Sequence, residues 1–176
     1  ILPWRNAPAV RRAMFSHHEI RLDEHRAWFQ RLQQDSSRRW FLYRDDTGTV
    51  QGVVSFTDLD PAQGTAFWGF YARPDAPAGT GLQILFAALD TAFGALALHK
   101  LNGEVLADNL RSLYLHQKVG FSEEGRFREQ HHDGSERLDI IRLGLLASEW
   151  AAHRPRLAER LYDQTRAAVD QDGEQV

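Results

Sequence analysis

The residue pattern changes twice between residues 65 and 107, and this constrains the fold more than any other feature of the chain. The sequence "TAFWGFYA" (Thr65–Ala72) is rich in aromatic residues and predicts a strand, whereas residues 82–93 place apolar side chains at helical spacing. The sequence "KLNGEVLA" (100–107) then predicts a short buried strand. Because two strands joined through a helix can run parallel, this segment predicts a strand–helix–strand unit of an α/β sheet.

The flanking segments extend this unit into a mixed sheet. Residues 40–44 and 50–57 are β-rich and surround a turn signal, and a second hairpin is expected within residues 127–145, around Asp133 and Gly134. Hairpin strands are antiparallel. The expected fold is therefore α/β, with a mixed central sheet of six to seven strands flanked by helices. Helices outside the central unit are expected at residues 4–14, 22–32, 109–119 and from Trp150 onward.

The chain of 176 residues is long enough to form one domain with a substantial core. It shows no internal repeat and no long linker, so we assign residues 1–150 to this domain and residues 151–176 to a C-terminal helical extension with a frayed tail. Five aromatic residues are expected in the core, namely Trp28, Phe29, Phe41, Phe67 and Phe86.

Charge and cysteine content exclude several classes of protein. There are 21 Lys and Arg residues against 24 Asp and Glu residues, whereas a nucleic-acid binder normally has a basic surface. The absence of cysteine excludes disulfides, thiolate metal sites and a cysteine nucleophile. No apolar run approaches the ~20 residues of a membrane span, and no signal-peptide pattern is present. We therefore expect a cytoplasmic protein that binds neither nucleic acid nor membrane.

Two pairs of adjacent histidines raise the question of a metal site. His17–His18 and His131–His132, the latter next to Asp133, could supply ligands. Adjacent residues rarely point at one ion, and there is no third cluster of ligand residues, so no metal is expected.

A glycine-rich turn is the first candidate for chemistry. In "APAGTGLQ" (76–83), Gly79 and Gly81 lie between a predicted strand and a predicted helix. Glycines allow backbone N–H groups to approach a ligand, and a helix N-terminus favours anions, which suits a pyrophosphate. The same glycines would also serve an ordinary turn, because the segment is neither a Walker loop nor a full G-x-G-x-x-G.

The second candidate is "NLRSLYLHQKVGF" (109–121), which predicts an amphipathic helix ending at Gly120. In a purely structural interpretation Asn109 is the N-cap, Leu110, Leu113 and Val119 are core residues, and Gly120 is the C-cap.

Together, the glycine turn and the later "N-x-x-S…K-x-G-F" resemble the GNAT superfamily of acetyl-CoA-dependent N-acetyltransferases over residues 50–145. The resemblance implies the GNAT fold and acetyl-CoA as co-substrate. The family usually has Gln or Arg where this chain has Ala76, so pyrophosphate binding would rest more on backbone amides. The residues implied to contact acetyl-CoA are Phe70, Tyr71, Ala72, Ala78, Gly79, Thr80, Gly81, Leu82, Asn109 and Ser112.

Other segments resemble a narrower branch of the superfamily, the UDP-4-amino-4,6-dideoxy-N-acetyl-β-L-altrosamine N-acetyltransferases of pseudaminic acid biosynthesis. These segments are "LPWRN", "MFSHHEI", "EHRAWF", "ALHKLNGEVLADN" and "GRFREQ". In that branch a first strand precedes "WRN", and this chain starts at Ile1 without it. The resemblance implies a small-molecule amine acceptor, a UDP-amino sugar, and leaves room for an oligomer. The residues implied to bind this acceptor are Trp4, Arg5, Asn6 and His25.

Alternatives remain at this stage. Trp4 could cap the core, Arg5 and Asn6 could lie on a solvated helix face, and His25 could be a surface residue. The ribosomal-protein alanine N-acetyltransferases share "N-x-x-S…GF", and a non-catalytic module binding acetyl-CoA or a nucleotide sugar is a further alternative.

Acetyl transfer to an amine needs a base for the amine, donors for the oxyanion and an acid for the thiolate. Glu104 is our candidate base, because a glutamate in an apolar strand costs stability unless it is paired or used; the alternative is an ion pair with Lys100 or an arginine.

His116 stands where the family has a proton-donating tyrosine, and a nearby Glu104 would favour its charged form; it is either the acid or the base. By resemblance, the oxyanion donor is the N–H of Tyr71 or of a neighbour.

Overall fold

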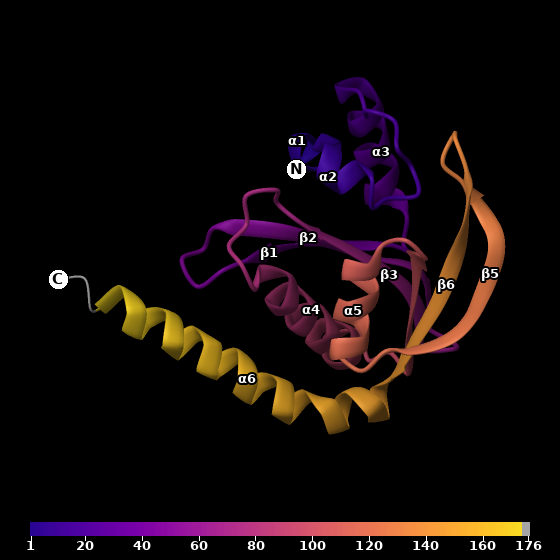
Figure 1. Cartoon of the computed structure of the whole chain (residues 1–176). Coiled ribbons are helices and arrows are strands. Elements are labelled where there is room, and N and C mark those ends of the chain that lie inside the picture. Colours follow the sequence, from indigo (N-terminus) through magenta and orange to yellow (C-terminus); the bar gives the residue numbers. More distant parts are fainter. Residues whose placement is uncertain (174–176) are drawn as a thin grey trace.

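One sheet of six strands organises the computed structural model, which describes the backbone of residues 1–173 and the side chains of residues 1–161. The strand order is β1-β2-β3-β4-β6-β5 (Figure 1). This confirms the predicted mixed sheet, although β5 starts well before the expected residue 127. The strands are β1 (Arg39–Arg44), β2 (Val50–Asp60), β3 (Thr65–Ala72), β4 (Lys100–Leu106), β5 (Ser122–His132) and β6 (Arg137–Leu146).

The sheet opens between its two central strands. β3 and β4 are parallel, and they pair only from Thr65 with Lys100 to Phe67 with Asn102. All other neighbouring strands pair in antiparallel fashion. β3 continues to Ala72 and β4 to Leu106, so both strands run on beyond their last pair with backbone groups facing the gap.

Helices cover the two faces of the sheet separately. In the view of Figure 1, α1 (Leu2–Asn6), α2 (Pro8–Arg11) and α3 (Leu22–Gln34) lie above the sheet. Below it lie α4 (Thr80–Asp90), its π-helical continuation η1 (Thr91–Ala95) and α5 (Leu110–Lys118).

The first predicted helix is interrupted. The helix expected over residues 4–14 consists of the short helices α1 and α2, with Ala7 in an extended conformation between them. Pro8 explains the break, because proline has no N–H to continue a helix and disfavours helical geometry in the residue before it.

The C-terminal helix α6 (Ala147–Gly173) begins inside the region assigned to the domain. Its Trp150 and Leu157 are buried in the main core, so the boundary drawn between residues 150 and 151 falls within a packed helix. Arg154 anchors the helix further through an ion pair with Asp90 at 2.7 Å. Residues 174–176 of the expected frayed tail lie outside the described residues.

The main core lies between the sheet and α4, with Phe56, Ile84, Leu85 and Leu101 fully buried. The prediction that Phe29 and Phe41 are core residues is wrong, since they are 51% and 40% exposed. β1 is an edge strand and α3 covers it only in part, through Trp28 packed against Trp40. Trp28, Phe67 and Phe86 are half-buried. In the part of the chain that is described, no helix combines the length and apolarity needed to cross a membrane.

Candidate active site

A cavity of about 510 Å³ lies at the opening between β3 and β4. Nine of the residues expected at the site line it, which are Phe70, Tyr71, Ala72, Thr80, Gly81, Glu104, Asn109, Ser112 and His116. Ala78, Gly79, Leu82, Trp4, Arg5, Asn6 and His25 do not. The sequence prediction missed Trp68 and Arg111, which line the cavity from β3 and α5, and Met14 and Phe15 from the loop after α2.

The turn before α4 has the geometry of an anion site. Gly79, the N-cap of α4, has a φ of 90°, a left-handed conformation that glycine adopts readily. Among the described residues, the N–H groups of Ala78, Gly79 and Gly81 have no acceptor. Leu82 differs, since its N–H donates to Gly79 and its side chain is buried in the core. The free amides at a helix N-terminus fit a pyrophosphate.

Helix α5 is capped as expected, and two of its three expected core residues are confirmed, since Val119 is fully buried and Leu113 packs against the core. The side-chain oxygen of Asn109 accepts a hydrogen bond from the N–H of Ser112 at 3.1 Å. Leu110, which the structural interpretation placed in the core, is 72% exposed, and Tyr114 is 61% exposed. The face that meets the cavity instead carries Ser112 and His116, one turn apart.

His116 is buried in an aromatic environment. Its ring packs against Trp68 and Phe121, with centroid distances of 5.3 and 4.9 Å. Nδ1 lies 2.8 Å from the carbonyl oxygen of Ser112, and because a carbonyl can only accept, Nδ1 carries the hydrogen. Burial lowers the pKa of His116, and the hydrogen bond to Ser112 opposes this only in part. The neutral ring therefore keeps its lone pair on Nε2.

Glu104 lies on the opposite face of the sheet. The preceding residue, Gly103, faces His116, since a Cβ added there would come within 3.4 Å of Nε2. Successive side chains of a strand alternate between faces, so Glu104 points toward the side of α1–α3. Its Oε1 accepts a hydrogen bond from Arg142 at 2.8 Å. The expectation that Glu104 would favour a charged His116 is therefore wrong, because the two side chains lie on different faces.

The backbone of β3 narrows the choice of oxyanion donor. The N–H of Arg73 donates to Gln51 on the β2 side at 2.8 Å. N–H groups two residues apart in a strand point the same way, so the N–H of Tyr71 also faces β2. The N–H groups of Phe70 and Ala72 face the opening toward β4. The N–H groups of Phe70 and Ala72 are therefore in position to donate to an oxyanion in the opening, whereas the N–H of Tyr71 is not.

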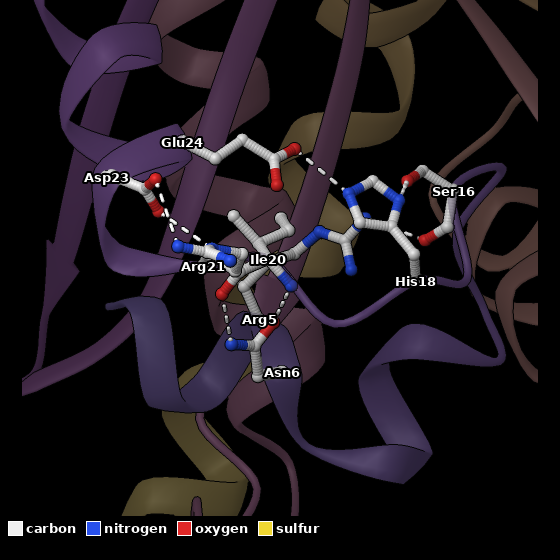
Figure 2. Close-up of polar contacts among 8 residues, drawn as sticks. All are labelled: Arg5, Asn6, Ser16, His18, Ile20, Arg21, Asp23 and Glu24. Carbon is white, nitrogen blue, oxygen red and sulfur yellow. Dashed lines mark hydrogen bonds and ion pairs between the residues drawn. The ribbon is translucent and has the colours of Figure 1, made fainter.

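The N-terminal residues expected to bind the acceptor hold a loop in place (Figure 2). The amide of Asn6 donates to the carbonyl of Ile20 at 2.8 Å and accepts from its N–H at 2.9 Å, so both of its polar atoms are engaged. Arg5 donates through Nη2 to the carbonyl of Ser16 at 2.9 Å. The segment held in this way includes Met14 and Phe15, which form part of the cavity wall.

Arg5 also lies beside a residue of the cavity. Its charge acts on Tyr71, which lines the cavity, and burial raises the pKa of Tyr71 to about 12. Burial likewise lowers the pKa of Arg5. The Nη1 of Arg5 and the Nε of the nearby Arg11 are buried without a hydrogen-bond partner. Two guanidinium groups with unused donors therefore lie on the same face as Glu104.

The remaining candidates have structural surroundings. His25 stacks on Trp28, with the ring centroids 5.0 Å apart, and burial lowers the pKa of His25. Trp4 is half-buried in α1. Among the described residues there is no group of three or more His, Cys, Asp or Glu side chains that could hold a metal ion.

The chain is similar to known proteins in both sequence and structure. Residues 1–122 match the acetyltransferase (GNAT) domain family. Acetyltransferase PseH of Campylobacter jejuni is 31% identical over 122 residues, covering 69% of this chain and 74% of that protein. Spermidine N(1)-acetyltransferase of Vibrio cholerae is 25% identical over 129 residues, covering 73% of this chain and 75% of that protein.

The structural comparison confirms the expected fold. A crystal structure of spermidine N-acetyltransferase from Vibrio cholerae, in complex with CoA and spermine, superposes with a TM-score of 0.79. The superposition covers 85% of this chain and 89% of that one, with 23% sequence identity. The mixed sheet with its central opening is thus the GNAT fold.

Proposed function

The chain belongs to the GNAT acetyltransferase family and is an acetyl-CoA-dependent N-acetyltransferase, and from this premise we propose a nucleotide sugar as its acceptor. The acceptor group is the 4-amino group of a UDP-linked amino-dideoxy sugar in pseudaminic acid biosynthesis. The segments that resemble this branch of the superfamily support the proposal, as does the similarity to acetyltransferase PseH.

The unpaired N–H groups of two arginines are the observation that supports a nucleotide sugar as the acceptor. Arg5 and Arg11 each keep a buried N–H without a partner, on the face of the sheet that also holds Glu104. A diphosphate accepts such donors with good geometry, whereas a polyamine would be repelled by them. We therefore assign the nucleotide part of the acceptor to this side of the cavity, with Arg5 as its main contact. Asn6 acts indirectly, by holding the loop.

The opening in the sheet separates two halves of the reaction. The turn Ala78–Leu82 would bind the pyrophosphate of acetyl-CoA on the side of α4 and α5, through the free amides of Ala78, Gly79 and Gly81. The acceptor amine approaches from the side of α1–α3, where Glu104 takes up its proton, directly or through a water. Attack forms the C–N bond of the amide and breaks the C–S bond of the thioester. The N–H groups of Phe70 and Ala72 stabilise the oxyanion.

His116 lies on the thiolate side of the opening. Because burial lowers its pKa, the ring is neutral at neutral pH and has no proton on Nε2 to donate at the start of the reaction. The attacking amine must lose a proton and the departing thiolate must gain one. His116 can act as the acid only by taking up a proton during turnover and passing it to sulfur.

A panel of acceptors tests this function. The protein is incubated with acetyl-CoA and either the UDP-amino sugar, spermidine or a ribosomal N-terminal peptide, and acetylated products are identified by mass spectrometry. The proposal predicts acetylation of the sugar, with Arg5→Ala raising the KM of the sugar and leaving the KM of acetyl-CoA unchanged. Turnover of spermidine or the peptide without turnover of the sugar would contradict it. Binding of acetyl-CoA with no transfer to any of these acceptors would favour a non-catalytic module.

A further inference from the structure

The carboxylate of Glu104 is held by one arginine from the neighbouring strand. Glu104 on β4 and Arg142 on β6 are direct cross-strand partners. Arg142 donates two hydrogen bonds, from Nη2 at 2.8 Å and from Nε at 3.2 Å, and both go to Oε1 of Glu104. Among the described residues Oε2 has no partner. The contact therefore fixes the carboxylate through one oxygen and leaves the other able to accept a proton.

Arg142 is itself held between two aromatic rings. Its guanidinium lies 4.5 Å from the centroid of Phe67 on β3 and 5.6 Å from that of Phe127 on β5. Both distances are in the range of cation–π interactions. Four neighbouring strands thus each contribute one side chain to the arrangement, and a flexible arginine is confined to one position.

This arrangement matters because a glutamate side chain has several rotatable bonds. An unrestrained carboxylate would reach the acceptor amine in only a fraction of its conformations, and small misplacements of a reacting group are costly in rate. The two hydrogen bonds from Arg142 restrict the carboxylate to one position. Because both donors are directed at the same oxygen, these benefits do not block the second oxygen.

We propose that Arg142, clamped between Phe67 and Phe127, is a positioning residue that orients Glu104 for proton transfer from the acceptor amine. This inference rests on the proposed role of Glu104 as the base. It assigns to Arg142 an effect on the chemical step. It assigns no effect on acetyl-CoA binding, since the glycine turn lies at the N-terminus of α4 on the other face of the sheet.

Steady-state kinetics of two substitutions test the proposal. Arg142→Gln should lower kcat about tenfold or more, because it frees the carboxylate, and should leave the KM of acetyl-CoA unchanged. Arg142→Lys keeps the positive charge but loses the planar pair of N–H donors that holds Oε1 of Glu104, so kcat should fall in this variant too.

Two further variants separate positioning from folding. Arg126→Gln breaks another cross-strand pair of the same hairpin, with Asp139 at 3.0 Å, and should leave kcat and both Michaelis constants unchanged. Phe127→Leu removes one ring of the clamp without changing any charge. It should lower kcat less than Arg142→Gln does, and it can be measured even if Arg142→Gln fails to fold.

Glu104→Gln distinguishes failure of the inference from failure of the proposed function. If Glu104→Gln retains full activity, Glu104 is not the base and the proposed mechanism is wrong. If Glu104→Gln is inactive while folded Arg142→Gln keeps the parental kcat, only the positioning role is overturned. An equal loss in Arg126→Gln and Arg142→Gln would also overturn it, because the effect would then be general to the hairpin.

Discussion

At the scale of single residues, His116 shows how the surroundings decide what a side chain can do. Its position in the sequence suggests a proton donor, whereas its burial against Trp68 and Phe121 favours a neutral ring, and the hydrogen bond to Ser112 opposes this only in part. A tyrosine at the same place would hold its proton to a pH of about 10. The two residue types therefore predict different pH dependences for the same step.

The lowered pKa of His116 has a consequence for stability. In the unfolded chain the histidine has its ordinary pKa of 6.5, so as pH falls below this value the unfolded state binds a proton that the folded state resists. The free energy of unfolding should fall with decreasing pH below 6.5, by at most about 1.4 kcal/mol per pH unit from this one group. Urea denaturation at several pH values measures it. His116→Phe should lack this component, and identical pH dependences would contradict the prediction.

The catalytic role of His116 is tested by restoring tyrosine. His116→Tyr should remain active and should keep its activity at higher pH than the parent, because its proton is available throughout this range. His116→Phe keeps the ring bulk but has no proton to transfer, and should lose about a hundredfold in kcat. Initial rates at saturating substrates from pH 5.5 to 9.5 measure both. A phenylalanine variant as active as the parent would make His116 a packing residue.

At the scale of secondary-structure elements, the start of α4 has the geometry needed to bind an anion. Gly79 supplies the left-handed turn, and the N–H groups around it remain free because the helix has not yet begun to use them. Gly81 has room for a side chain, since an added Cβ would lie 3.5 Å from Leu115, an ordinary contact. Substitution at Gly81 can therefore obstruct a ligand without disturbing the core.

Gly81→Val should weaken CoA binding at least about tenfold, or ~1.4 kcal/mol, because the branched side chain stands where the phosphates approach the amides. Isothermal titration calorimetry measures the affinity. Gly94→Val is the matched control, as it places valine in a helical segment where an added Cβ meets nothing within 4 Å. Equal CoA affinity of folded Gly81→Val and the parent would refute the pyrophosphate site.

At the scale of the whole molecule, helix α1 holds in place a loop that forms part of the cavity wall. The loop between α2 and α3 is fastened to α1 by Asn6 and Arg5, and it carries Phe15 over the cavity. Phe15 also meets His131 at the end of β5, with ring centroids 5.6 Å apart. The side of the cavity that we propose for the acceptor is therefore formed by the start of the chain, which contacts the second hairpin.

Asn6→Ala removes two hydrogen bonds to Ile20 and should destabilise the fastened loop by about 1–3 kcal/mol. We expect the KM of the acceptor to rise and that of acetyl-CoA to stay unchanged, because the loop borders only the acceptor side. Arg21→Ala is the control in the same segment, since it breaks an exposed ion pair with Asp23. A parallel rise in both Michaelis constants would show that Asn6 supports the fold as a whole.

The sequence by itself determined most elements of this protein and the glycine turn before α4, because these depend on neighbours in the chain. Strand and helix periodicity, the turn glycines and the N-cap Asn109 are local features. β1–β4, β6, α4 and α5 lie close to where they were expected, whereas β5 begins before the expected residue 127. The predictions of burial were wrong at positions where packing by segments distant in the sequence decides whether a side chain is buried. Leu110 and Phe41 are apolar, but no other element packs over them closely enough to bury them.

The tertiary structure alone decided how the proposed catalytic groups, Glu104 and His116, are arranged. Glu104 and Arg142 are 38 residues apart, and their contact follows from the register of β4 on β6, which no local pattern encodes. The placement of His116 and Glu104 on opposite faces follows from the alternation of β4 at the opening beside β3. Burial sets the charge state of His116 and the unused donors of Arg5 and Arg11. These properties depend on which surfaces exclude water, and that is settled only when the whole chain has folded.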